Sequence, residues 1–176
     1  GYFGSLDKSK GSNFIISLSK KDKQNMYFIY GGKSEEVQKL KRNKPNNLKI
    51  FSSVPYSKVK LLISRMDILL MPSNTKKLRS LGGVGNIAKF TSPIKLFDYL
   101  ASGKLIIASN LKVFKEVLKD QKNCIIIDRL DENIWKNKIS KINFKRQSEM
   151  KKTKAKFEIF PNKIRNESDV NMINDL

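Results

Sequence analysis

Short apolar runs alternate with amphipathic stretches along most of the chain. Runs that stay apolar over four or more positions predict strands that are buried on both faces. Four such runs occur, in "MYFIYGG" (26–32), "DILLMPS" (67–73), "LIIAS" (105–109) and "NCIIID" (123–128), and "LKIFSSV" (48–54) is predicted as another strand. The opening "YF" is typical of the end of a further strand.

Between these runs, apolar residues recur at helical spacing. Amphipathic helices are therefore predicted at 12–21, 34–43, 55–66, 91–102, 110–120 and 132–142. Ser34 is expected to cap the second helix, and Pro55 fits the start of the third. Strict alternation of strand and helix predicts an α/β fold, a doubly wound, Rossmann-like parallel sheet of about six strands.

The pattern also predicts the domain organisation and the place of a binding site. Residues 1–143 are expected to form one Rossmann-like domain, and 144–176 a polar, partly helical extension. In doubly wound sheets, ligands bind beyond the carboxyl ends of the strands, where the strand order reverses. In the common order this lies between the first and fourth strands. The loops at 4–11 and 74–90 are therefore expected to face each other across one crevice.

Composition narrows the classes of function. Lys and Arg number 36 against 16 Asp and Glu, a formal charge of +20. The lysines are spread along the chain and arginine is scarce, whereas nucleic-acid readers rely on arginine for bidentate contacts, so we expect no nucleic-acid partner. Weak contact with an anionic membrane surface fits this charge better. With no histidine and only Cys124, a zinc or copper site has few ligands.

The stretch "TSPIKLFDYLASGKLIIAS" carries the strongest local signals. Thr91 or Ser92 can cap a helix, and Pro93 fits its first position. Such a start also presents free N–H groups and the positive end of the helix dipole, which bind phosphate. The positive charge of Lys95 lies near the positive end of the helix dipole, which is unfavourable unless an anion is bound there. Asp98 lies about one turn after Lys95 on the same face of the helix. Two interpretations stay open, a phosphate site or a well-capped helix with a solvated Lys95–Asp98 ion pair.

Other loops carry weaker signals. Lys10 and Gly11 fit a turn at a helix start as well as a phosphate contact. The glycine-rich "SLGGVGN" (80–86) fits a mobile loop or an anion-binding nest. Because the chain has no GxGxxG after the first strand and no GxxxxGK[ST], dinucleotide-binding and P-loop proteins are disfavoured.

Taken in order, these motifs resemble the C-terminal, nucleotide-sugar-binding domain of retaining glycosyltransferases with the GT-B fold (family four, also called group 1). The most specific piece, "TSPIKLFDYLASGKLIIASNLKVFKEVL", is similar to the family signature of SPxK, an acidic residue, Tyr, a small residue, Gly-Lys, an apolar strand, Ala-Ser and a later Glu-Val. "YFGSLDKSKGSNFII", "MYFIYGG" and "VPYSKVKLLISRMDILLMPS" are similar to the family's preceding elements. The resemblance implies a nucleoside-diphosphate sugar as donor and retaining transfer of a hexosyl group.

The resemblance also implies which residues bind the donor. Lys10 and the helix start contact the diphosphate, Asp98 takes the place of the family's ribose-binding glutamate, and the loop at 54–55 packs on the base. The implied substrate-binding residues are Gly4, Lys10, Val54, Pro55, Thr91, Ser92, Pro93, Ile94, Lys95 and Asp98. Ile94 contributes a backbone amide. No catalytic residue is assigned.

The sequence departs from the family pattern at two places. Members often carry an arginine where Ser5 stands, and Lys95 or Lys89 is expected to replace its charge. Many members have a sugar-contacting glutamate where Phe90 stands, so the identity of the sugar stays open.

In this family the acceptor site and several catalytic groups, including a histidine in many members, lie on an N-terminal domain. We therefore expect this chain to need such a domain as partner and to be inactive in transfer alone. No metal or other cofactor is expected, because paired aspartates are missing. The acceptor would be a cell-surface glycan or a lipid-linked sugar, in the cytoplasm or at the inner membrane face. An epimerase-like domain and a non-catalytic nucleotide-binding module remain as alternatives.

Overall fold

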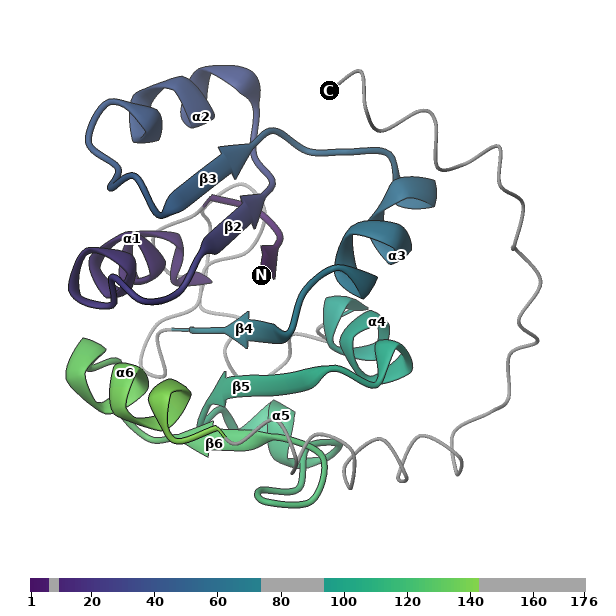
Figure 1. Ribbon diagram of the computed structural model, residues 1–176. Coiled ribbons are helices and arrows are strands. Elements are labelled where there is room, and N and C mark those ends of the chain that lie inside the picture. Colours follow the sequence, from purple (N-terminus) through teal and green to yellow (C-terminus); the bar gives the residue numbers. More distant parts are fainter. Residues whose placement is uncertain (7–9, 74–93, 143–176) are drawn as a thin grey trace.

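The computed structural model describes residues 1–6, 10–73 and 94–142, in which strands and helices alternate as predicted (Figure 1). The strands are β1 (Tyr2–Phe3), β2 (Tyr27–Tyr30), β3 (Leu48–Phe51), β4 (Ile68–Met71), β5 (Leu105–Ser109) and β6 (Ile125–Ile127). The helices are α1 (Ser12–Lys21), α2 (Ser34–Lys41), α3 (Tyr56–Ser64), α4 (Ile94–Ser102), α5 (Lys112–Lys115) and α6 (Glu132–Ser140).

All strand pairs are parallel and fall into two three-stranded sheets, β1-β2-β3 and β4-β5-β6. The two sheets meet beside β1 and β4. There the Gly1 amine donates to Ile68 O at 2.6 Å, and Leu70 N–H donates to Gly1 O at 2.8 Å. The spatial order is therefore β3-β2-β1-β4-β5-β6, the doubly wound order (Figure 1). The predicted fold is confirmed, with its six strands divided between two three-stranded sheets.

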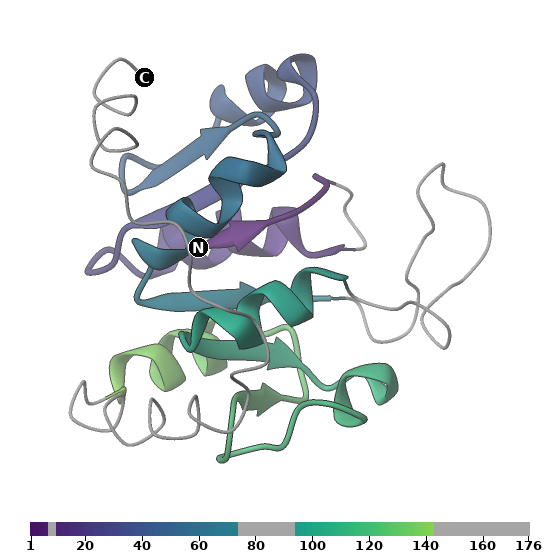
Figure 2. The same cartoon turned by 90° about the vertical axis from the view of Figure 1, so that its right-hand side faces the viewer.

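Side chains alternate between two apolar layers, one on each face of the sheet. In β5, Ile107 belongs to the apolar cluster that contains residues of α1, α2 and α6, whereas Ile106 and Ala108 belong to the cluster that contains residues of α3, α4 and α5. Figure 1 shows α1 and α6 on one side and α3 and α4 on the other, and Figure 2 looks onto the α3 and α4 side. Burial on both faces explains why β4 and β5 are apolar along nearly their whole length. The edge strand β3 instead alternates buried Leu48 and Ile50 with exposed Lys49 and Phe51.

The α1–α6 side is held by one large aromatic residue. The Trp135 side chain is fully buried, and its ring meets Phe14 of α1 edge to face with centroids 5.1 Å apart. Its indole N–H donates to Arg129 O at 3.0 Å. Burying the ring while satisfying its one donor makes this contact a main source of cohesion between the two helices.

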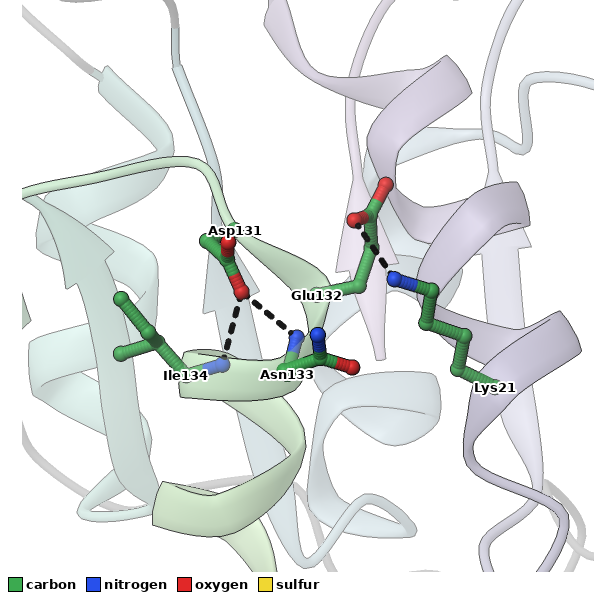
Figure 3. Close-up of polar contacts among 5 residues, drawn as sticks. All are labelled: Lys21, Asp131, Glu132, Asn133 and Ile134. Carbon is green, nitrogen blue, oxygen red and sulfur yellow. Dashed lines mark hydrogen bonds and ion pairs between the residues drawn. The ribbon is translucent and has the colours of Figure 1, made fainter.

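Two polar contacts complete the same side (Figure 3). Lys21, the last residue of α1, forms an ion pair with Glu132 of α6 at 3.4 Å. Asp131 caps α6 by accepting from the backbone N–H groups of Asn133 at 2.8 Å and Ile134 at 3.1 Å. The cap satisfies two of the helix's unpaired donors.

Two predicted helix ends are wrong. Ser34 is the first residue of α2 and not its cap. Lys33 precedes it and donates its backbone N–H to the Glu36 carboxylate at 2.7 Å. The helix predicted over 110–120 is only the single turn of α5. The chain leaves the helix early because Asp120 accepts from Ile126 N–H at 2.7 Å, which draws the segment towards β6.

The boundary predicted at 143 and the extension over 144–176 lie outside the described residues, as does the loop at 74–90. Within the part that the structure describes, no helix has the length and apolar character of a membrane span.

Candidate functional site

The carboxyl ends of β1 and β4 meet at the start of α1. Gly11 precedes that helix with φ of +84°, and a Cβ built on it would lie 2.4 Å from the carbonyl oxygen of Pro72, which follows β4. Only glycine combines this backbone conformation with so close an approach. The end of the loop after the first strand therefore lies against the end of the fourth strand. The predicted crevice between this loop and the loop at 74–90 stays a prediction, because residues 7–9 and 74–90 lie outside the described residues.

Lys95 extends from the first turn of α4 into the same region. Its Nζ lies 4.4 Å from the centroid of the Tyr2 ring in β1, within cation–π distance. A Cβ on Gly4, directly after β1, would lie 2.8 Å from the same Nζ. The absence of a side chain at Gly4 thus leaves room for the ammonium group. Gly4 and Lys95, both predicted site residues, are brought together.

Tyr99 fixes α4 against β1, one turn after Lys95. Its ring is fully buried, and its hydroxyl oxygen accepts from Phe3 N–H at 2.8 Å. The two rings also pack edge to face with centroids 6.2 Å apart. The sequence marked Tyr99 only as part of a signature. A buried tyrosine needs a partner for its hydroxyl, but sequence does not show which one.

The electrostatics of this region favour an anion. Burial, with a smaller contribution from the positive charge of Lys10, lowers the pKa of Lys95 to about 7. In residues 1–6, 10–73 and 94–142 neither lysine pairs with a carboxylate, and the ion pair found there is Lys21–Glu132. The predicted alternative of a Lys95–Asp98 ion pair is therefore wrong. Ser5 Oγ, also buried, has no hydrogen-bond partner among the same residues.

Asp98 contacts a tyrosine instead of a lysine. Tyr56, the first residue of α3, donates its hydroxyl to Asp98 Oδ1 at 2.6 Å. The Tyr56 side chain is 62% exposed, and Asp98 is half-buried. Sequence analysis missed Tyr56, and the only available signal was its place directly after Pro55.

The remaining predicted residues fall into two groups. Half-buried Val54 and exposed Pro55 lead directly into Tyr56, which places this loop next to Asp98. Ile94 is the first residue of α4. Thr91, Ser92 and Pro93 lie outside the described residues, as do Lys89 and Phe90, so their roles stay predictions.

The described residues bring together no group of three or more His, Cys, Asp or Glu side chains that could hold a metal ion. Cys124 is buried, and burial raises the pKa of its thiol to about 12. It is therefore an inert core residue.

Residues 1–158 match the sequence model of the family described as "Glycosyl transferases group 1". This chain belongs to the group 1 glycosyltransferases. The match spans every helix and strand that the structure describes and confirms the resemblance seen in the motifs. A search of curated proteins gave no match.

Solved structures of low sequence identity share the fold. HepE from Anabaena, crystallised in complex with UDP-glucose, is 15% identical with a TM-score of 0.62 over 85% of this chain and 41% of HepE. TarM is 16% identical with a TM-score of 0.64 over 99% of this chain and 34% of TarM. The group 1 glycosyltransferase therefore has the fold of a GT-B C-terminal domain and spans less than half of these two chains.

The C-terminal domain of LpcC from Francisella tularensis, a group 1 family glycosyl transferase, offers a comparison at domain scale. It is 16% identical with a TM-score of 0.57 over 88% of this chain and 78% of that domain.

Proposed function

We propose that this group 1 glycosyltransferase chain binds a nucleoside-diphosphate sugar beyond the carboxyl ends of β1 and β4. The observation that carries the proposal is the position of the Lys95 Nζ over the Tyr2 ring and beside Gly4, with no carboxylate of the described residues to neutralise Lys95 or Lys10. Besides burial, the positive charge of Lys10 lowers the pKa of Lys95, so the two like charges repel. A diphosphate bound to both lysines turns this repulsion into attraction.

The parts of the donor follow from this anchor. The diphosphate lies between the two lysines and the N-terminus of α4. There it faces the Ile94 amide and the predicted helix start at Thr91, Ser92 and Pro93. Asp98 accepts hydrogen bonds from the ribose, and the base packs on the loop at 54–55. The UDP-glucose complex of HepE supports a donor of this class.

The proposed chemistry follows from the same charges. As the sugar leaves, negative charge grows on the nucleoside diphosphate, and the lysines and the helix dipole stabilise it without a metal ion. The chain supplies the donor half of a retaining hexosyl transfer, and a separate N-terminal domain supplies the acceptor site. The acceptor is a cell-surface glycan or a lipid-linked sugar, met in the cytoplasm or at the inner membrane face.

Calorimetric titration of the purified chain tests the proposal. We expect saturable binding of UDP or GDP that persists in EDTA, no comparable binding of a random oligonucleotide, and weaker nucleotide binding by Lys95→Gln. Lys104→Gln is the matched control, because it removes the same charge beyond the opposite end of α4. A folded chain that binds neither nucleotide refutes the proposal, and a strict need for Mg²⁺ or Mn²⁺ refutes its metal-independent part.

The epimerase alternative loses support from the family match. The non-catalytic alternative predicts nucleotide binding without any transfer. Transfer assays separate the remaining possibilities. We expect none with the chain alone and activity once an N-terminal acceptor domain is joined to it.

A further inference from the structure

We propose that Tyr56 is a positioning residue for Asp98. It holds the carboxylate through Oδ1, and so leaves Oδ2 to accept hydrogen bonds from the ribose. This inference rests on the proposed function, in which Asp98 binds the ribose. The tyrosine itself touches neither the phosphates nor the sugar.

The contact has the geometry of a strong hydrogen bond. The two oxygens are 2.6 Å apart, as expected for a hydroxyl donating to a charged carboxylate. Asp98 forms no ion pair with any residue that the structure describes. The tyrosine hydroxyl is therefore the contact that selects one rotamer of Asp98, whose ordering would otherwise be part of the entropy lost on donor binding.

Tyr56 reaches Asp98 because α3 begins where it does. Pro55, with φ of −54° and ψ of 143°, precedes the first residue of α3 and ends the loop from β3. Tyr56 then projects from the first turn towards α4, which packs against α3 (Figure 2). Its ring is 62% exposed, so core packing does not account for a tyrosine here.

The protonation states also suit the role. The hydrogen bond and negative charge of Asp98 raise the pKa of Tyr56 above its ordinary value. The phenol therefore stays protonated at neutral pH and can donate. Because Val54 and Pro55 directly precede Tyr56, the same bond joins the loop proposed for the base to the acid proposed for the ribose.

Parallel titrations with UDP and inorganic pyrophosphate test the role, because pyrophosphate carries the charge without the ribose. We expect Tyr56→Phe, which keeps the ring, to weaken UDP binding about fivefold and to leave pyrophosphate binding unchanged. Asp98→Asn should weaken UDP binding at least as much. The double variant should be little weaker than Asp98→Asn, because the tyrosine acts through the acid. Exposed Ser57→Ala is the control.

A second measurement uses the unmutated tyrosine. Tyrosine labelled at Cζ reports the pKa of Tyr56 by NMR, and we expect Asp98→Asn to lower it. An unchanged pKa would show that the bond is not formed in solution and would overturn the inference.

Other results would also overturn it. If Tyr56→Phe binds UDP as tightly as the wild-type chain, Tyr56 has no effect on binding. If it binds UDP more tightly, Tyr56 competes with the ribose for Asp98. Additive losses in the double variant would show that it acts independently of the acid. If the wild-type chain binds pyrophosphate as tightly as UDP, only the proposed contact of Asp98 with the ribose is refuted. If it binds neither pyrophosphate nor UDP, the proposed function is refuted as well.

Discussion

Two helix pairs on opposite faces of the sheet are each joined by one exposed polar contact. Lys21–Glu132 joins α1 to α6 at 3.4 Å, and Tyr56–Asp98 joins α3 to α4 at 2.6 Å. The first lies about 15 Å along α1 from the Gly11 turn, because that helix has ten residues that each rise about 1.5 Å. The second lies one turn from Lys95.

The difference lies in what surrounds each contact. Beside Lys21–Glu132, Asp131 caps α6 and Trp135 is fully buried, so charges and donors are satisfied within the protein. Beside Tyr56–Asp98, the Lys95 ammonium has no carboxylate partner among the described residues, and the Phe97 ring on the same helix is 53% exposed. A polar contact alone therefore does not mark a site, whereas unneutralised charge beside it does.

Trp135→Ala should have the largest effect on stability of the variants that test this comparison. The loss of a buried indole and its contact with Phe14 is expected to lower the free energy of unfolding by about 3–5 kcal/mol. Urea denaturation measures it. Ile134→Ala is the control, because that side chain is 39% exposed and should cost under about 1 kcal/mol. An equal cost at both positions would mean that the aromatic contact does not hold the α1–α6 side together.

Lys95 should give the largest effect on binding. Charge-assisted contacts contribute about 1.5–3 kcal/mol, so we expect Lys95→Gln to weaken UDP binding about tenfold or more. Lys95→Arg should retain most of the affinity. Titration calorimetry at pH 6 measures the UDP affinity of both variants. Equal losses of affinity in Lys95→Arg and Lys95→Gln would show that the positive charge of Lys95 does not contribute to UDP binding.

The pH dependence of the same binding has a definite sign. Lys95 has a pKa of about 7 in the free protein, and a bound diphosphate raises it because the ammonium gains an opposite charge. UDP binding should therefore take up a proton above pH 7, and affinity should fall as pH rises from 7 to 9. The proton uptake appears as a buffer-dependent enthalpy that Lys95→Arg lacks. Proton release would contradict the assignment.

Stability without ligand should move in the opposite direction. In the unfolded chain the pKa of Lys95 lies near 10.5, so unfolding takes up a proton between about pH 7 and 10.5. The contribution of Lys95 to stability therefore rises with pH across this window and is lost as pH falls through 7. Urea denaturation of wild type and Lys95→Gln across the window isolates that contribution, and parallel curves would contradict it.

Asp131→Ala should have a smaller effect confined to stability. Loss of the cap leaves the N–H groups of Asn133 and Ile134 without their acceptor, at a cost of about 1 kcal/mol. Asp131→Asn should recover most of it. UDP titration serves as the functional control, and weaker UDP binding by a fully folded Asp131→Ala chain would mean that the two helix pairs are coupled.

Lys21→Gln should have the smallest effect. An exposed ion pair contributes about 0.2–1 kcal/mol, and salt screens it. Denaturation with and without 0.5 M NaCl, compared with Lys20→Gln, measures the pair. A loss larger than that of Trp135→Ala would show that the α1–α6 contact depends on charge more than on Trp135.

The sequence predicted best what depends on neighbouring residues. The bounds of α1 and β5 agree with prediction, because the helical spacing around Ile15 and the apolar run 105–109 are local signals. The end of α5 was not predicted correctly, because the Asp120 carboxylate accepts a hydrogen bond from Ile126 N–H in β6, a contact that the local sequence does not show. Gly4 and Lys95 were assigned to one site by the family resemblance.

Tyr56 and Tyr99 could not be assigned from the sequence. Their partners, Asp98 and Phe3, lie 42 and 96 residues away, and hydrogen bonds over such separations leave no periodic pattern. The Lys95–Asp98 pair was a reasonable local expectation that failed because each side chain has a partner on a different element, the Tyr2 ring and Tyr56.

Two close backbone contacts limit how this domain can be redesigned. Gly11 touches Pro72, and a Cβ on Gly31 would lie 1.7 Å from Gly4 O, so neither loop can shift without displacing its neighbour. Insertions or grafts in these loops would be poorly tolerated. Pro55, by contrast, is exposed and Val54 is half-buried, so libraries for a new nucleotide preference should vary these two positions and keep the glycines fixed.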